Sequence, residues 1–391
     1  MPEPTICFVA REDFVSKPGG DTVQWRLYEA AAKAAGMPCA AWFDDAPMPD
    51  ADVFHALNVD RPLEIYPKMR EAHRRNRPFI LSTVHHPVPW LERFRKVEPP
   101  GGTLGRILYR SPFGRTVPAS ESVKEIVRLA QQRRLGHLGD LWPSWPARIR
   151  WLLEQASRVM LLARKEEDYL RADFNADLIS EKTVVVPNWV EGVGEDRSND
   201  GSPFLKEWPE SPVLVVSRIE ARKNVRRLAI LAEQVQRPVL FLGQPNPNEG
   251  TYVRAFQQVV QTSRFPRWVP GVPRPELSAC YRAGSFLLNA SYVEVSPLVD
   301  IEALRFGCPV ATTRYALHHE LLPVGTPVCD AYDDSELAAR LQWRPARLAP
   351  TETVNPGACR QTLLETYRAV AAERRWRSVQ TPGVRPAGPS F

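Results

Sequence analysis

The chain has 391 residues, of which 38 are proline, and a formal net charge of +6. An apolar fraction of 43% together with charges of both signs excludes a chain that is disordered throughout, and 21 scattered glycines exclude a collagen-like repeat. At roughly 150 residues per domain, the length predicts two or three domains.

The basic charge is concentrated in one segment. Residues 90–150 hold 12 Lys and Arg against 5 Asp and Glu, so the rest of the chain sums to −1. A nucleic-acid-binding surface over the whole chain is therefore excluded, and one local basic surface is predicted.

Short apolar runs alternate with amphipathic segments in the first half. The runs predict strands at 5–10, 38–43, 53–57, 78–84, 159–163 and 182–187. Helices are predicted at 22–35, 63–75, 120–134 and 151–157. This alternation is typical of parallel α/β units with both sheet faces covered. Between 87 and 151 the chain is rich in Arg, Gly, Pro and Trp, and the flanks of the 120–134 helix are expected to be loops.

A second alternation of the same kind follows a polar, turn-rich stretch. Strands are predicted at 213–216, 239–242, 268–269, 286–289 and 309–312. Helices are predicted at 224–235, 251–261, 275–282, 297–306 and 361–376. Two parallel-sheet halves of similar size predict an α/β fold with the active site in a cleft between them.

The predicted domains follow from this pattern. The first covers 1–191 and contains the basic segment 90–150. A linker covers 192–211, and the second domain covers 212–350. A C-terminal helix within 351–376 precedes a loose tail at 377–391.

The six cysteines form no CxxC pair and most lie in apolar runs, which predicts buried thiols in a reducing compartment; they are Cys7, Cys39, Cys280, Cys308, Cys329 and Cys359. The first residues lack the features of a signal peptide, and no apolar run reaches about 20 residues. A cytoplasmic protein that can lie against a membrane is predicted.

Two glutamates flank the start of the predicted 297–306 helix. Backbone N–H groups at this helix end would face an anion. Glu294 could then accept hydroxyl hydrogen bonds beside the anion, and Glu302 could hold a ribose diol. Two glutamates eight positions apart are common by chance, so their spacing alone does not identify a site.

A basic turn follows the first strand of the second half. Arg218 and Lys223 lie where the carboxyl ends of parallel strands bind ligands. A guanidinium and an ammonium that converge suit a diphosphate, although a solvated basic turn is the alternative.

Five features occur in a fixed order between 213 and 322. The Arg-x4-Lys turn is followed by a strand ending in Gly243 and by a short strand running through Val269 into Gly271. The Glu-x7-Glu segment and a Gly-x-Pro-Val strand start at Gly307 complete the series. This set resembles the donor domain of retaining GT-B glycosyltransferases of family 4.

The first half is compatible with the same resemblance. It has a glycine pair after its first strand, a strand that ends in two histidines, and a Pro-Asn-Trp-Val segment at 187–190 that resembles the family's Pro-Asn-Gly-Val.

The resemblance implies the GT-B fold, in which two Rossmann-like domains face each other across a cleft. It implies an enzyme that moves a sugar from a nucleotide-diphosphate-sugar, with retention, to a hydroxyl of a glycan or lipid-linked glycan. Polysaccharide or glycolipid biosynthesis would be the setting. The acceptor would bind to the first domain and the donor to the second, with no metal and no cofactor besides the co-substrate.

The resemblance also implies roles for individual residues. Arg218 and Lys223 would neutralise the leaving diphosphate, Glu294 would contact the transferred sugar, and His85 would line the acceptor or sugar side. Further donor contacts are implied for Gly19, Gly20, Gly243, Val269, Gly271, Val272, Ser296, Leu298, Val299 and Glu302.

Two departures leave alternatives open. Val295-Ser296-Pro297 stands where the family usually has Gly-Phe-Gly, and Pro297 removes one backbone donor. Trp189 replaces the usual glycine after Asn188. These changes fit an altered donor choice, a nucleotide-sugar epimerase, or a non-catalytic nucleotide-sugar binding protein.

The basic segment has three interpretations. It is a solvated surface, or a surface for an anionic membrane or a lipid-diphosphate acceptor, or a nucleic-acid surface. The membrane or lipid-diphosphate interpretation rests on the arginines of the segment together with tryptophans, which are typical of a membrane interface, namely Trp90, Trp142, Trp145 and Trp151. No recognition motif supports nucleic acid.

Other histidines favour structural roles. His55 lies within a predicted strand and is expected to be a core residue. His318 and His319 are adjacent and project differently, so no third ligand completes a metal site with them.

Overall fold

The computed structural model of the protein describes residues 2–11, 14, 19–43, 46–99, 107–109, 111, 116–131, 135–191, 208 and 210–380. Most of the predicted linker, at 192–207 and 209, lies outside the described residues. The same holds for 381–391 of the predicted tail.

The first sheet has six parallel strands, in the order β2-β1-β3-β4-β5-β6. All six were predicted, and they are β1 (Ile6–Val9), β2 (Cys39–Trp42), β3 (Val53–Leu57), β4 (Phe79–Ser82), β5 (Arg158–Leu161) and β6 (Thr183–Val185). β1, β3 and β4 are buried along their whole length, as expected for strands covered on both faces.

The helices described in this half are α1 (Gly20–Ala34), α2 (Pro62–Arg74), α3 (Val88–Val97), α5 (Val117–Gln131), α6 (Trp145–Gln155) and α7 (Lys165–Phe174). α3 corrects the expectation of loops around the 120–134 helix, and α6 begins before residue 151. α3 starts between two prolines, which the first turn of a helix tolerates because its N–H groups have no helical partner.

The second sheet is also parallel, in the order β12-β11-β10-β7-β8-β9. Its strands are β7 (Val213–Val216), β8 (Val239–Leu242), β9 (Pro266–Val269), β10 (Leu287–Leu288), β11 (Val310–Thr313) and β12 (Val328–Cys329). Around it lie α8 (Val225–Gln234), α9 (Gly250–Thr262), α10 (Arg274–Ala283), α11 (Leu298–Arg305) and α12 (Asp334–Leu341). Only β12 and α12 were not predicted.

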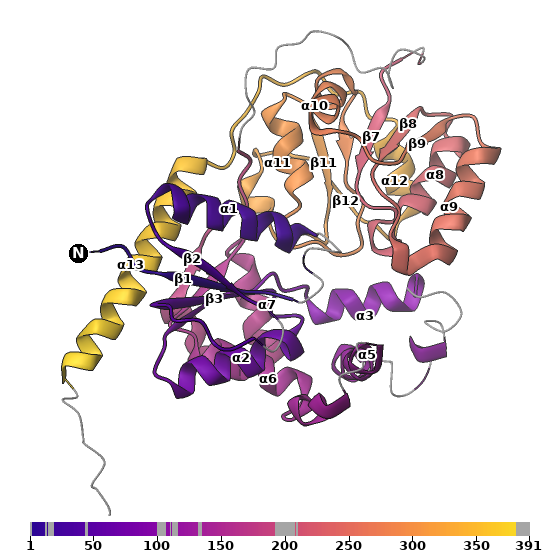
Figure 1. Cartoon of the computed structure of the whole chain (residues 1–391). Helices are drawn as coiled ribbons and strands as arrows, with labels where there is room; N and C mark the ends of the chain where they lie inside the picture. Colours follow the sequence, from indigo (N-terminus) through magenta and orange to yellow (C-terminus); the bar gives the residue numbers. More distant parts are fainter. Residues whose placement is uncertain are drawn as a thin grey trace, which may run out of the picture.

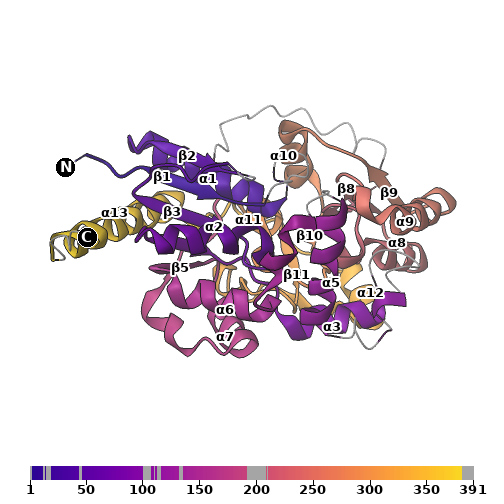
Figure 2. The same ribbon diagram turned by 60° about the horizontal axis from the view of Figure 1, so that its bottom comes forward.

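The two halves lie against each other, with the second half above the first in Figure 1. The Asn188 side-chain amide donates to the Ser296 carbonyl over 3.1 Å, and Arg305 donates to the Val190 carbonyl over 3.3 Å. Figures 1 and 2 both place α3 against the second half, where Phe94 stacks on Tyr292 with ring centroids 5.5 Å apart. Part of the basic segment is therefore an internal contact between the halves.

The C-terminal helix α13 (Pro356–Gln380) returns to the first half and lies beside α1 in Figure 1. It is longer at both ends than the predicted 361–376 helix. The Tyr367 hydroxyl lies 2.8 Å from His55 Nδ1, and Ser82 Oγ lies 2.8 Å from His55 Nε2. Burial lowers the pKa of His55 to about 3, so this histidine is a neutral core residue, as predicted.

The Tyr367 hydroxyl is expected to stabilise the docking of α13. Tyr367→Phe leaves one ring nitrogen of a fully buried histidine without its partner. The free energy of unfolding should fall by about 1–2 kcal/mol. Urea denaturation followed by circular dichroism measures it, and an unchanged midpoint and slope would show that this hydrogen bond contributes nothing.

Candidate functional site

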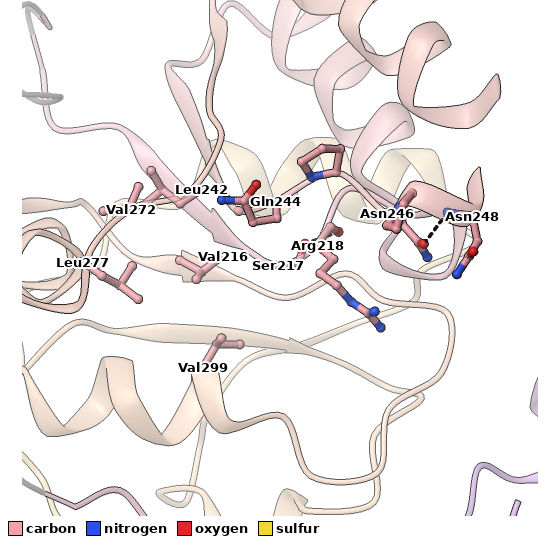
Figure 3. Close-up of a pocket in the computed structure, with 13 residues that line it drawn as sticks. Val216, Ser217, Arg218, Leu242, Gln244, Asn246, Asn248, Val272, Leu277 and Val299 are labelled. Carbon is pink, nitrogen blue, oxygen red and sulfur yellow. Dashed lines mark hydrogen bonds between the residues drawn. The ribbon is translucent and has the colours of Figure 1, made fainter. Parts of the chain in front are cut away.

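A cavity of about 450 Å³ lies at the carboxyl ends of β7 and β8. Figure 3 shows Leu242, Val272 and Leu277 at one end with Gln244 beside Leu242, and Arg218, Asn246 and Asn248 toward the other end. Its lining includes Val216, Ser217, Arg218, Leu242, Gly243, Gln244, Asn246, Asn248, Val272, Leu277 and Val299. A mostly apolar cavity with a few polar groups at this edge of a parallel sheet is suited to a small ligand.

Two of the predicted glycines, Gly243 in the cavity wall and Gly271 nearby, have backbone angles that favour glycine. Gly243 has φ +149°, and a Cβ on it would lie 2.0 Å from the Ser217 carbonyl oxygen. Gly271 has φ +75°, and a Cβ there would lie 2.0 Å from Gln244 Nε2. Val269 ends β9 beside them, and its carbonyl accepts the Gly243 N–H over 3.2 Å. A larger residue at Gly243 would clash with the backbone of the neighbouring strand end, whereas one at Gly271 would displace the Gln244 side chain.

Lys223 and Glu294 form a close ion pair next to this cavity. They line a smaller hollow that shares Val216, Ser217 and Val299 with the cavity and lies between β7 and β10. These two strands are neighbours at the point where the strand order reverses, which is the ligand-binding edge of such sheets. α11 begins one residue before Val299, so its positive end lies at the same place.

The charge of Glu294 is fixed by its neighbours. Burial would raise the pKa of this carboxyl, but the charges of Lys223 and Arg222 outweigh burial and hold the pKa at about 2. Glu294 is therefore a carboxylate near neutral pH. It can accept hydrogen bonds from ligand hydroxyls, and it cannot serve as a general acid there.

Arg218 lies on the rim of the cavity with 44% of its side chain exposed. Its guanidinium is 3.2 Å from Glu220 Oε2, and the same Glu220 oxygen accepts from the Asn246 amide over 2.9 Å. The predicted residues thus line two adjacent hollows: Arg218, Gly243, Val272 and Val299 line the cavity, and Lys223, Glu294 and Val299 line the smaller hollow.

Of the ten predicted donor contacts, only Gly243, Val272 and Val299 line either hollow, and Glu302, Leu298 and Ser296 are bound or packed elsewhere. Glu302 accepts from Tyr281 Oη over 3.2 Å and from Arg274 over 3.1 Å, and burial raises its pKa. Leu298 packs against the core of the first half. Ser296 is buried, and its carbonyl is bound by Asn188. Ligand contacts by these residues stay predictions.

The glycine pair stands at the carboxyl end of β1, where the order of the first sheet also reverses. A Cβ on Gly20 would meet nothing within 4 Å, whereas the Gly19 N–H already donates to Thr22 Oγ1 over 3.0 Å. Asp21 sits beside them, bound by Arg11 over 2.7 Å. Room for a ligand therefore exists at Gly20, while the Gly19 amide is engaged within the helix cap.

His85 is fully buried in the first half, away from both hollows. Its Nδ1 lies 2.6 Å from Asp60 and its Nε2 2.9 Å from Asp173. Burial favours the neutral ring, but the two carboxylates outweigh burial and raise the pKa of His85 to about 9. This geometry does not favour the predicted ligand contact, because both ring nitrogens already bind carboxylates.

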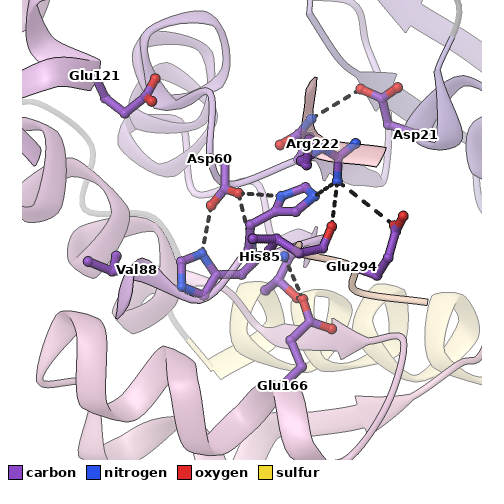
Figure 4. A network of polar contacts seen from close by, with 12 residues as sticks. Asp21, Asp60, His85, Val88, Glu121, Glu166, Arg222 and Glu294 are labelled. Carbon is purple, nitrogen blue, oxygen red and sulfur yellow. Dashed lines mark hydrogen bonds and ion pairs between the residues drawn. The ribbon is translucent and has the colours of Figure 1, made fainter. Parts of the chain in front are cut away.

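His86, which was not predicted as a site residue, faces the second half. Its Nε2 lies 3.0 Å from Arg222 Nη1, and its Nδ1 lies 2.9 Å from Asp60 (Figure 4). Both histidines bind Asp60, but only His86 also reaches the second half. The sequence pattern did not indicate which of the two would do so.

His318 is a core residue of the second half. His318 Nε2 lies 3.1 Å from Asp300 Oδ2, both side chains are fully buried, and Asp300 also accepts from Thr312 over 2.6 Å. Among the residues that the structure describes, no three His, Cys, Asp or Glu side chains are placed to hold a metal ion.

The six cysteines all belong to the described residues, and none forms a disulfide there. Over the same part of the chain, no helix combines the length and the apolar character needed to cross a bilayer.

Comparison with solved structures shows the fold. Sucrose-phosphate synthase from Thermosynechococcus elongatus is 16% identical, with a TM-score of 0.58, and the match covers 97% of this chain and 98% of that one. HepE from Anabaena, solved with UDP and glucose, is 14% identical, with a TM-score of 0.53 and coverage of 97% and 99%. HepE solved with UDP-glucose has a TM-score of 0.51, 14% identity and 95% coverage of both chains.

These similarities confirm the predicted fold class, an α/β GT-B arrangement of two Rossmann-like domains. No protein-family model matches the chain, and neither does any curated protein.

The His85 cluster predicts a pH-dependent stability. Its folded pKa of about 9 exceeds the ordinary 6.5, so its stabilisation is complete below pH 6.5 and is lost as the pH rises through 9. The free energy of unfolding should fall by up to about 3 kcal/mol over this interval. Urea titrations at several pH values measure it, and His85→Gln should show a flatter dependence. A wild-type profile as flat as that of the variant would contradict the charged state of His85.

Proposed function

We propose that the protein is a retaining glycosyltransferase that moves a sugar from a nucleotide-diphosphate-sugar to a hydroxyl of a glycan or lipid-linked glycan. The observation that carries the proposal is that the 450 Å³ cavity lies next to the Lys223–Glu294 pair at the reversal point of the second sheet, with Val216, Ser217 and Val299 lining both the cavity and the small hollow at the pair. A ligand with its apolar ring in the cavity would direct its phosphates and sugar toward the pair.

We infer a place for each part of the donor. The base would occupy the apolar end near Val272 and Leu277, and the diphosphate would lie between Arg218, Lys223 and the first residues of α11. The sugar would follow beside Glu294. HepE has been solved with UDP and UDP-glucose, which makes uridine nucleotides the first to test here.

Positive charge at the leaving group would supply most of the catalysis. Arg218 and Lys223 are held in place before the donor binds, Arg218 by Glu220 and Lys223 by Glu294. Such preorganised charge stabilises the diphosphate as it departs, in the way a metal ion does in other enzymes. We therefore propose a metal-independent reaction, in a cytoplasmic setting of polysaccharide or glycolipid synthesis.

The basic segment supports a peripheral contact with an anionic membrane. Of nine exposed large hydrophobic side chains among the described residues, six lie between 90 and 150, namely Val97, Ile107, Ile126, Val127, Leu138 and Trp142. Trp142 is 80% exposed, whereas Trp145 is buried. Exposed apolar groups within a basic segment suit the interface of an anionic bilayer.

A nucleotide-sugar epimerase or a non-catalytic binding protein is the second candidate. Pro297 stands at the N-cap of α11 and cannot donate a hydrogen bond to the sugar. An epimerase would release an isomerised sugar without an acceptor.

Removal of either member of the ion pair should abolish turnover in a folded protein. Lys223→Ala and Glu294→Ala should each lower the rate of donor consumption by roughly 100-fold or more, because each removes a fixed charge at the reacting groups. The assay is release of nucleoside diphosphate from a panel of nucleotide-sugars, with the anomeric form of the product read by NMR.

Arg264→Ala is the matched control, since Arg264 is exposed at the start of β9 and stacks on Phe265. It should keep the wild-type rate. Near-wild-type rates for both ion-pair variants would contradict the assigned site. Nucleotide binding without turnover of any donor would favour the non-catalytic alternative.

Membrane contact should depend on Trp142 and on lipid charge. The protein should sediment with phosphatidylglycerol vesicles at low salt and less with phosphatidylcholine vesicles, and added salt should release it. Trp142→Ser should weaken binding several-fold, while Val324→Ser, an exposed position in the second half, should not. Equal sedimentation with both lipids would rule out the electrostatic contact.

A further inference from the structure

Arg222 lies between the two predicted cations of the basic turn and had no predicted role. We propose that Arg222 is a positioning residue that holds the two halves together through His86 and thereby sets the surroundings of Glu294. The inference rests on the proposed function for the role of Glu294, and the contact between the halves can be tested without it.

In the first half, hydrogen bonds to Asp60 hold the His86 ring in place. Asp60 follows β3, and its two carboxylate oxygens bind His85 Nδ1 over 2.6 Å and His86 Nδ1 over 2.9 Å. The same carboxylate accepts the His86 backbone N–H over 3.0 Å. His85 is held in turn by Asp173, which also accepts the first N–H of α3, from Val88. The His86 ring is therefore held by Asp60, which the fully buried His85 links to Asp173.

The partners of His86 define its protonation. The Asp60 carboxylate only accepts, so the proton of the ring lies on Nδ1. The Arg222 guanidinium only donates, so Nε2 carries a lone pair and accepts from it over 3.0 Å. His86 in this contact is a neutral ring with one defined tautomer.

The Arg222 side chain is also held in place by hydrogen bonds within the second half. Its Nη1 donates to the Val293 carbonyl over 3.0 Å, and its Nη2 donates to Glu220 over 3.2 Å. Burial disfavours its charge, but Glu220 and Glu294 outweigh burial and raise its pKa. Figure 4 shows the guanidinium between the Asp60 cluster and Glu294.

The contact controls which groups reach Glu294. Lys223 occupies Glu294 Oε1, and Arg222 Nη1 lies 3.8 Å from Oε2, beyond hydrogen-bond distance. His86 and the Val293 carbonyl hold the guanidinium there. If the halves separate, Arg222 loses its contact with His86. The Glu294 carboxylate is a stronger acceptor than any neutral group nearby, so Arg222 would then bind Oε2. The contact therefore keeps Oε2 available to a sugar hydroxyl only while the halves are together.

Another arginine makes a contact between the halves without reaching Glu294. Arg226 of α8 pairs with Glu98 over 3.2 Å, and 37% of its side chain is exposed. Exposed ion pairs contribute little to stability. Arg226→Met is thus a matched control that removes an arginine and a contact between the halves.

The experiment compares Arg222→Met, His86→Leu, His86→Gln and Arg226→Met in the full chain. Spin labels at Arg74→Cys on α2 and Arg254→Cys on α9 report the distance between the halves, with half-buried Cys39 replaced by serine. Donor consumption is measured on the same variants without labels, and circular dichroism verifies that each one folds.

Arg222→Met and His86→Leu should broaden the distance distribution and lower kcat/KM for the donor by about fivefold or more. His86→Gln should restore both, because an amide can donate to Asp60 and accept from Arg222. Arg226→Met should match the wild type. The double variant Arg222→Met with His86→Leu should be no worse than the poorer single variant, as for two residues that act through one contact.

Unchanged distances in both Arg222→Met and His86→Leu would overturn the proposal, as would additive losses in the double variant. If His86→Leu does not fold, Arg222→Met and His86→Gln still decide the matter. If the wild-type protein consumes no donor, the proposed function fails, and the distance measurement alone supports or overturns the contact.

Discussion

The Lys223–Glu294 ion pair is the interaction on which the functional part of the structure depends. Lys223 comes from the turn after β7 and Glu294 from the segment after β10, so the pair joins two strand ends at the reversal point of the second sheet. Parallel strands bring all their carboxyl ends to one edge, and that edge faces the first half. The pair keeps a cation and a carboxylate in place where burial alone would disfavour each charge.

The contact between the halves extends this ion pair into one connected polar network. Glu294 is near Arg222, Arg222 binds His86, and Asp60 joins His86 to the charged His85. α3 adds an apolar contact beside the network through Phe94 and Tyr292. The donor-side carboxylate is thus tied to the core of the first half, which is how a change in the relative position of the halves can reach the reacting groups.

The sequence allowed most of the fold to be predicted, because buried parallel strands read as short apolar runs with helical segments between them. α7 was missed since its polar first turn resembles a loop, and β12 is only two residues long. The ordered motifs contain Lys223 and Glu294, which the structure pairs, and Gly243, which lines the neighbouring cavity. They could not show that His85 is enclosed by Asp60 and Asp173 or that His86 faces Arg222, because these contacts join residues far apart in the chain.

The most direct test of a donor site at this cavity is calorimetric titration of the full chain with uridine, guanosine and adenosine diphosphates. A donor site predicts one-to-one binding of at least one nucleotide, weakened by Gly243→Val, which would force a side chain against the Ser217 carbonyl. Absence of binding for all three, or equal binding by the Gly243→Val protein, would contradict it.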